Sequence, residues 1–143
     1  MLKLIELIKY SNTLKGWISM AKAIQTKKAP QAIGPYSQAI DLGDLIFVSG
    51  QIPINPGNGE IASGIEDQTA QVMKNIEAVL HEASITFTDV VKFTIYITNM
   101  DDFATVNQVY SAYLTEPYPA RATVEVSRLP KGVSIEMDVI AKR

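Results

Sequence analysis

The sequence has no cysteine and only one histidine, His81, among its 143 residues. Without cysteine the chain can form no disulfide, thiol nucleophile, iron-sulfur cluster or thiolate zinc site, and this composition fits a reducing compartment. A single histidine cannot build a histidine-rich metal site, and its position late in a predicted helix favours a solvated imidazole over a catalytic base. Any chemistry must therefore use carboxylate, arginine, hydroxyl, amide or backbone groups together with water.

The chain also lacks a charge excess and a long apolar run. Thirteen Lys and Arg residues oppose fifteen Asp and Glu residues, so the net charge of -2 supplies no strong field to hold nucleic acid or an anionic membrane surface. The longest uncharged stretch, residues 45–59, contains two prolines and three glycines, which excludes a membrane-spanning helix there. With 47% apolar residues, this length predicts one soluble domain, for which we expect a cytoplasmic location.

Residues 1–19 differ from the rest of the sequence. Their apolar spacing permits a short amphipathic helix, and Glu6 is their only acidic residue beside three lysines. Three interpretations compete: an organelle-targeting leader, a partner-binding helix, or sequence upstream of a true start at Met20. A mitochondrial leader is rich in arginine and serine, whereas this segment has no arginine and two serines. We therefore favour the third interpretation, and expect residues 1–19 to be an extension upstream of a true start at Met20 and residues 20–143 to form a single domain.

Apolar periodicity predicts six strands and two helices. The strand candidates are residues 21–26, 36–42, 45–49, 90–98, 122–126 and 133–141. Ser63-x-x-Glu66 has the form of a capping box before a helical stripe made of Val72, Ile76, Val79, Leu80 and Ala83. A second helix is capped by Asn99 or Asp101, ends before Pro117, and has the stripe Phe103, Val106, Tyr110, Tyr113 and Leu114. This order predicts an α+β fold, with a mainly antiparallel sheet and both helices on one face.

The last two predicted strands each have one apolar side and one polar side. If they form an antiparallel hairpin around residues 129–130, burying both apolar sides places Thr123 opposite Glu136. That register brings Arg121, Thr123 and Glu136 to one surface. Spacing alone favours an ordinary solvated sheet face, whose ion pairs contribute little to stability.

Two further features have structural explanations as well as functional ones. Asn107 lies on the apolar stripe of the second helix, so its amide must bond either to a neighbouring loop as a structural tie or within a functional site. Residues 55–60 (NPGNGE) match neither a phosphate-binding loop nor a dinucleotide fingerprint, and Asn58-Gly59 is typical of a hairpin turn.

Five motifs, in order along the chain, resemble those of the RidA family of reactive intermediate deaminases, formerly grouped as YjgF proteins. They are residues 33–38 (IGPYSQ), 48–53 (VSGQIP), 103–110 (FATVNQVY), 119–126 (PARATVEV), and 128–131 (RLPK) with Ile135-Glu136. The resemblance implies a chorismate-mutase-like α+β fold and a homotrimer with active sites in the clefts between subunits. It also implies hydrolysis of 2-imino acids or their enamine tautomers, such as 2-iminobutanoate and 2-aminoacrylate, to 2-keto acids and ammonia, without cofactor or metal.

The resemblance also suggests roles for individual residues. Arg121 is expected to grip the substrate carboxylate, and Glu136 to act as general acid and base on the attacking water. Tyr36 is expected to shape the pocket as a third catalytic residue. The expected substrate-binding residues are Ser49, Gly50, Asn107 and Thr123. Archetypal bacterial members carry cysteine where this chain has Thr123, which argues against any thiol mechanism, and the connection over residues 115–120 is shorter than theirs.

Two other functions compete with hydrolysis. A non-enzymatic trimer that binds keto acids or other metabolites, or acts as a chaperone, would need Arg121 but not Glu136. An RNA-cleaving translation inhibitor, a role attached to some relatives, is disfavoured by the net charge and by the absence of a basic stripe with stacking aromatics. Substituting Glu136 with alanine separates the first alternative from the deaminase, because only the deaminase would lose turnover.

Overall fold

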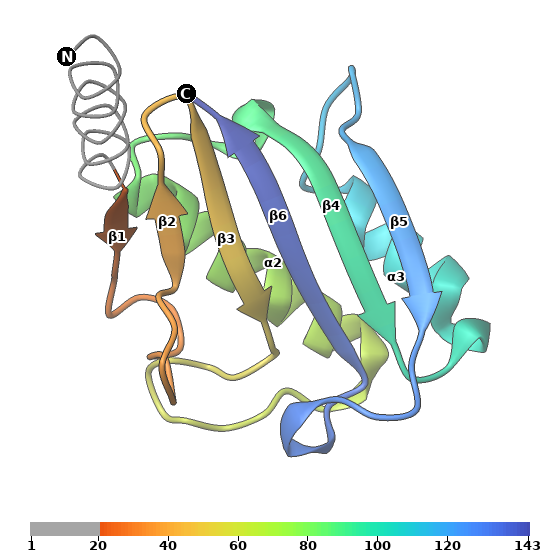
Figure 1. Ribbon diagram of the computed structural model, residues 1–143. Coiled ribbons are helices and arrows are strands. Elements are labelled where there is room, and N and C mark those ends of the chain that lie inside the picture. The colour runs from red at the N-terminus through yellow and green to blue at the C-terminus, as the bar shows by residue number, and fades with distance from the viewer. Residues whose placement is uncertain (1–20) are drawn as a thin grey trace, which may run out of the picture.

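One six-stranded sheet with both helices on the same face makes up the computed structural model, which describes residues 21–143 (Figure 1). The elements are β1 (Lys22–Ile24), β2 (Ala39–Asp41), β3 (Leu45–Gln51), α2 (Gly64–Glu82), β4 (Val90–Ile97), α3 (Phe103–Ser111), β5 (Ala120–Glu125) and β6 (Ile135–Lys142). Short 3-10 turns, η1 (Phe87–Asp89), η2 (Met100–Asp102) and η3 (Pro130–Gly132), join some of them. The six predicted strands, the two helices and the α+β class are confirmed. The predicted extension over residues 1–19 and the start at Met20 lie outside the described residues.

Within residues 21–143 the strands follow the order β1-β2-β3-β6-β4-β5, and only the β4–β5 pair is parallel. The predicted hairpin between the last two strands is therefore wrong, because β4 lies between β5 and β6. After β4 the chain crosses over through α3, and a crossover of this kind returns the next strand parallel to the first. β6 then enters the middle of the sheet, where β3 and β4 both pair with it.

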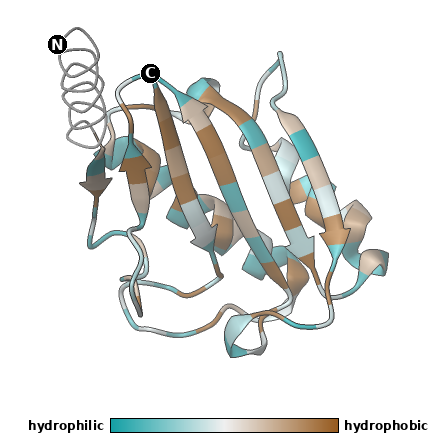
Figure 2. Cartoon of the chain, in the orientation of Figure 1, coloured by the Kyte–Doolittle hydropathy of each residue, from teal (hydrophilic) through white to brown (hydrophobic). Residues whose placement is uncertain are grey.

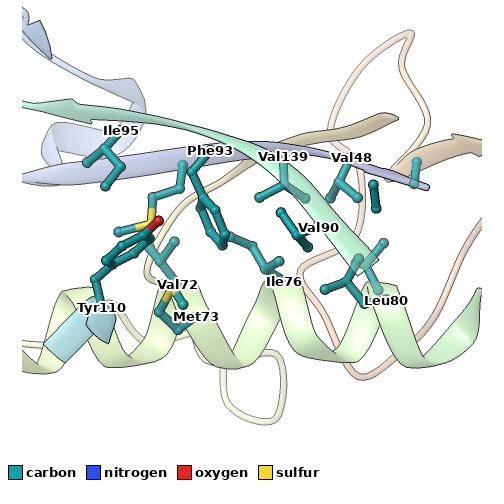
Figure 3. Close-up of a cluster of buried hydrophobic side chains, with 14 of the residues drawn as sticks. Val48, Val72, Met73, Ile76, Leu80, Val90, Phe93, Ile95, Tyr110 and Val139 are labelled. Carbon is teal, nitrogen blue, oxygen red and sulfur yellow. The ribbon is translucent and has the colours of Figure 1, made fainter. Parts of the chain in front are cut away.

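The core fills the space between the sheet and α2 (Figure 3). From α2 it receives the predicted stripe, with Val72, Ile76, Val79 and Leu80 all fully buried. From the sheet it receives alternate residues of β4 and β6, which are Phe93, Ile95, Ile97, Ile135, Met137 and Val139. Because the side-chain period of a strand is two, the residues between these point to the opposite face of the sheet. Within residues 21–143, no helix is long and apolar enough to cross a membrane.

The two helices begin differently. Ser63 occupies the N-cap position of α2, but its side chain makes no capping hydrogen bond, so the predicted capping box does not form. The φ of 78° at Gly64 turns the chain out of the helical geometry that such a cap requires. At the second helix, the Asn99 side chain accepts a hydrogen bond of 3.0 Å from the Asp101 amide at the start of η2, which runs directly into α3.

The sheet face opposite the helices, here called the open face, mixes polar and apolar residues. Glu136 and Tyr96 lie directly opposite each other on this face, between the buried residues of β6 and β4. Two large apolar side chains, Phe47 on β3 and Val124 on β5, remain 42% and 41% exposed. Figure 2 shows hydrophobic and hydrophilic residues alternating along the central strands.

Candidate active site

Arg121 projects from edge strand β5 toward the helices. It pairs with the fully buried Phe93 of β4, and paired residues of neighbouring strands point to the same face. The guanidinium carbon lies 5.4 Å from the ring centroid of Phe103 and 5.3 Å from that of Tyr110. Its Nη1 donates a hydrogen bond of 2.5 Å to Asn107 Oδ1. Two aromatic rings and an amide thus hold one cation in place at the margin of the sheet.

A cavity of about 640 Å³ opens beside Arg121, between α3 and the segment that leads into β5. Among the residues that the structure describes, Arg121 is the only charged one in this lining, which also includes Asn107, Tyr110 and Tyr118. The remaining guanidinium donors make no hydrogen bond or ion pair with any part of the chain that the structure describes. A guanidinium with free, coplanar donors in a cavity without carboxylates is suited to bind a carboxylate in bidentate fashion.

Thr123 lies two residues beyond Arg121 and on the same face, where it pairs with the buried Ile95. Its hydroxyl is inaccessible to solvent and makes no hydrogen bond within residues 21–143. A buried hydroxyl without a partner is unfavourable, and Thr123 is not among the described residues that line the cavity beside Arg121. We call Phe103, Asn107, Tyr110, Arg121 and Thr123 the arginine half-site.

Glu136 projects from β6 onto the open face, since its neighbours Ile135 and Met137 are fully buried on the other side. It lines a cavity of about 540 Å³ together with Tyr36, Ser49, Gly50 and Asp138. We call these five residues the glutamate half-site. Burial raises the pKa of Glu136 above its ordinary value, and the Asp138 carboxylate raises it further. A carboxylate with a raised pKa is a stronger proton acceptor, as general base catalysis requires.

A bulge in β3 brings the backbone against Glu136. The β3–β6 register shifts between Val48 and Gln51, which places Ser49 and Gly50 at the irregularity. A Cβ atom added to Gly50 would lie 1.9 Å from Glu136 Oε1, a distance that no stable contact allows. Only glycine therefore lets the Glu136 carboxyl group pack this closely on β3.

Hydrogen bonds fix the loop that carries Tyr36 to the same bulge. Ser49 Oγ donates to the Ser37 carbonyl at 2.6 Å, and the Ser49 amide donates to the Gln38 carbonyl at 2.9 Å. The buried Gln38 side chain accepts from the Thr26 amide at 2.7 Å and donates to the Pro30 carbonyl at 2.8 Å. Tyr36, half exposed at the rim, accepts a weak hydrogen bond of 3.4 Å from the Ile33 amide.

The two half-sites lie on opposite faces of the sheet, so the predicted surface shared by Arg121, Thr123 and Glu136 is wrong. The cause is the strand order: Arg121 pairs with buried Phe93, whereas Glu136 pairs with Tyr96 on the open face. Within one chain, Arg121 is hydrogen-bonded to Asn107. Glu136 packs against Gly50 and lines a separate cavity together with Tyr36.

Three contributors to these half-sites were missed by sequence reasoning. Phe103 and Tyr110 were assigned only to the apolar stripe of the second helix, although they also contact Arg121. Asp138 follows Glu136 by two residues, a spacing that places both on one face of a strand and could have identified it. Among residues 21–143, no group of three or more His, Asp and Glu side chains is arranged to hold a metal ion.

Comparison with known proteins finds similarity along almost the whole described chain. A family model described as Endoribonuclease L-PSP matches residues 26–143. The 2-iminobutanoate/2-iminopropanoate deaminase of Escherichia coli K12 is 47% identical over 127 residues, which cover 87% of this chain and 99% of that protein. A RutC family protein of Pyrococcus abyssi is 58% identical over 124 residues, which cover 85% of this chain and 98% of the relative.

Solved structures agree with the sequence similarities. The crystal structure of RidA from the Antarctic bacterium Psychrobacter sp. superposes with a TM-score of 0.84 at 44% identity, covering 85% of this chain and 99% of that one. The crystal structure of E. coli TdcF with bound serine gives a TM-score of 0.83 at 45% identity, covering 85% of this chain and 98% of that one.

Proposed function

The chain belongs to the Endoribonuclease L-PSP family, which includes the RidA-type deaminases, and from this membership we infer that it is a hydrolytic deaminase of reactive 2-imino acids. The predicted family and the RidA-type α+β fold are both confirmed. The observation that carries the function is the 47% identity to the E. coli 2-iminobutanoate/2-iminopropanoate deaminase across nearly all of that enzyme. The reaction adds water to the C=N carbon of a 2-imino acid and releases a 2-keto acid and ammonia.

Arg121 binds the substrate carboxylate in this proposal. The contacts with Phe103, Tyr110 and Asn107 fix the guanidinium before substrate arrives, so little side-chain entropy is lost on binding. Solvent does not reach the Thr123 hydroxyl, so we assign this group no contact with the substrate. The bound carboxylate sets the position of the neighbouring C2 atom, which is the electrophile.

Glu136 moves the protons. Its carboxylate accepts a proton from the water that attacks C2 and delivers it to nitrogen, which gives a carbinolamine. It then accepts the proton of the new hydroxyl group and delivers that proton to nitrogen as the C–N bond breaks, so C2 becomes a carbonyl carbon and ammonia leaves. Two protons are taken and two are returned, so the carboxylate is restored after each turnover. Tyr36 closes the rim of the cavity and donates a hydrogen bond to the substrate, while Ser49 and Gly50 hold the loop and the carboxyl group in place.

A second copy of the chain is needed to bring Arg121 and Glu136 together. In a single chain the two half-sites lie on opposite faces of the sheet. A 2-imino acid is a small molecule and cannot contact both faces at once. The open face carries exposed Phe47 and Val124, which a second copy would cover. We therefore retain the homotrimer implied by the resemblance, with each active site formed by the arginine half-site of one subunit and the glutamate half-site of the next.

The direct test is the release of ammonia and 2-oxobutanoate from freshly generated 2-iminobutanoate. The protein is expected to accelerate release beyond spontaneous hydrolysis, and Glu136→Ala is expected to abolish that acceleration while preserving 2-oxobutanoate binding. Binding without acceleration by the unaltered protein would instead indicate the metabolite-binding or chaperone-like trimer. Incubation of the same preparation with RNA tests for the endoribonuclease activity from which the family takes its name. Cleavage that Arg121→Ala and Glu136→Ala both leave intact would point to a separate site or a contaminant.

A further inference from the structure

We propose that Tyr96 and Asp138 are positioning residues for Glu136: the Tyr96 hydroxyl fixes the Asp138 carboxylate beside Glu136, and this fixed negative charge makes Glu136 a better proton acceptor. The proposal rests on the role given to Glu136 above. In this proposal both residues act through Glu136 and not on the substrate itself.

The register of the sheet brings the three side chains together. Tyr96 of β4 lies directly opposite Glu136 of β6, and Thr94 lies directly opposite Asp138. All four residues point to the open face, because the residues between them are buried in the core. The Tyr96 side chain runs diagonally past Glu136, and its hydroxyl donates a hydrogen bond of 2.9 Å to Asp138 Oδ2.

The hydrogen bond has a fixed direction. The hydrogen bond to Asp138 raises the pKa of Tyr96, and burial raises this pKa further. The Tyr96 phenol therefore keeps its proton. Asp138 consequently remains the acceptor, and its carboxylate cannot turn freely toward solvent. An ion held in one orientation acts on its neighbour more strongly than a mobile one that water can screen.

Few other charges face Glu136 within the described chain. Of residues 21–143, Glu136 and Asp138 are the only charged ones that line their cavity, and Tyr36, from the loop before β2, is the only other titratable one. On the β3 side Glu136 meets Ser49 and Gly50, which do not titrate, and on the β4 side it meets Tyr96. In the assembled site the Arg121 guanidinium of the second copy also faces this carboxyl group. The Asp138 charge opposes the effect of that guanidinium and keeps Glu136 basic.

The pH dependence of turnover tests the pair. Glu136 must be deprotonated to accept the proton of water, so activity is lost as pH falls through its pKa. Removing the Asp138 charge lowers that pKa, and Asp138→Asn is therefore expected to move the acidic limb of the kcat profile toward lower pH. Plateau kcat is expected to fall, because a less basic carboxylate is a weaker catalyst. Asp67→Asn, which removes the same charge from the exposed surface of α2, serves as the matched control and is expected to leave the limb in place.

Tyr96→Phe keeps the ring and removes only the hydroxyl. It is expected to shift the limb in the same direction but by less, and to produce no further shift in an Asp138→Asn background. An unchanged limb in Asp138→Asn, or an equal Tyr96→Phe shift with and without Asp138, would overturn the proposal. These failures differ from failure of the proposed function, which would appear as no deaminase activity in the unaltered protein. Melting temperatures and 2-oxobutanoate affinities, measured in parallel, separate a tuned carboxylate from a misfolded site.

Discussion

Mixing two inactive variants tests whether each active site contains residues from two chains. Arg121→Ala lacks a functional arginine half-site, and Glu136→Gln lacks a functional glutamate half-site. Suppose that every active site is formed by these half-sites across a subunit interface. A trimer that contains both variants then has an active site wherever a Glu136→Gln chain supplies Arg121 and the adjacent Arg121→Ala chain supplies Glu136. In an equal, randomly assembled mixture each requirement is met with a probability of about one half, so activity recovers to about one quarter of the unaltered protein.

A second mixture provides the control for this prediction. Combining the unaltered chain with the Arg121→Ala, Glu136→Gln double variant leaves about one quarter of the activity if sites span two chains, but about one half if each site lies within one chain. Both mixtures are prepared by joint unfolding and refolding, and assembly is checked by analytical ultracentrifugation. Ammonia release then gives the active fraction. No recovery in the first mixture, with half the activity in the second, would refute an active site shared between subunits.

Three substitutions probe the half-sites separately. Arg121→Lys keeps the charge but loses the planar donors that face Asn107 and the carboxylate, so calorimetry is expected to show about tenfold weaker binding of 2-oxobutanoate. Glu136→Gln is expected to lower kcat by about 100-fold with little change in that affinity, and full activity would remove the proposed proton carrier. Gly50→Ala places a Cβ atom 1.9 Å from Glu136 Oε1, so the carboxyl group must move and kcat is expected to fall by about 10- to 100-fold. A Gly50→Ala enzyme with normal kcat would show that this packing is unimportant.

The sequence predicted the positions of the helices and strands better than it predicted which strands pair with each other. Apolar periodicity located all six strands and both helices, because burial on one face imposes a local pattern. It could not reveal that β6 pairs with β3 and β4, since pairing between distant segments leaves no local signal. The hairpin prediction assumed that consecutive strands are adjacent, which is the commoner arrangement but not the one found here.

The candidate site shows the same division between local and non-local information. Motif resemblance named Arg121, Glu136, Tyr36 and Asn107, and the hydrogen bond between Arg121 and Asn107 places two of them in contact. The alternation of each strand correctly gave a polar and an apolar side. The face of the sheet on which a strand's polar side lies depends, however, on the strand that it pairs with. The prediction paired β5 with β6 in place of β4, and this placed Arg121 on the wrong face.

The central position of β6 also has a consequence for how the protein acquires its structure. β6 follows the other five strands in the sequence, so it leaves the ribosome after them. Until it arrives, β3 and β4 have no partner between them, and the core lacks Ile135, Met137 and Val139. Such long-range pairing makes folding slow, and it leaves two strand edges open to association during synthesis. Glu136 also lies on β6, so the glutamate half-site and the complete sheet form only after β6 has been synthesised.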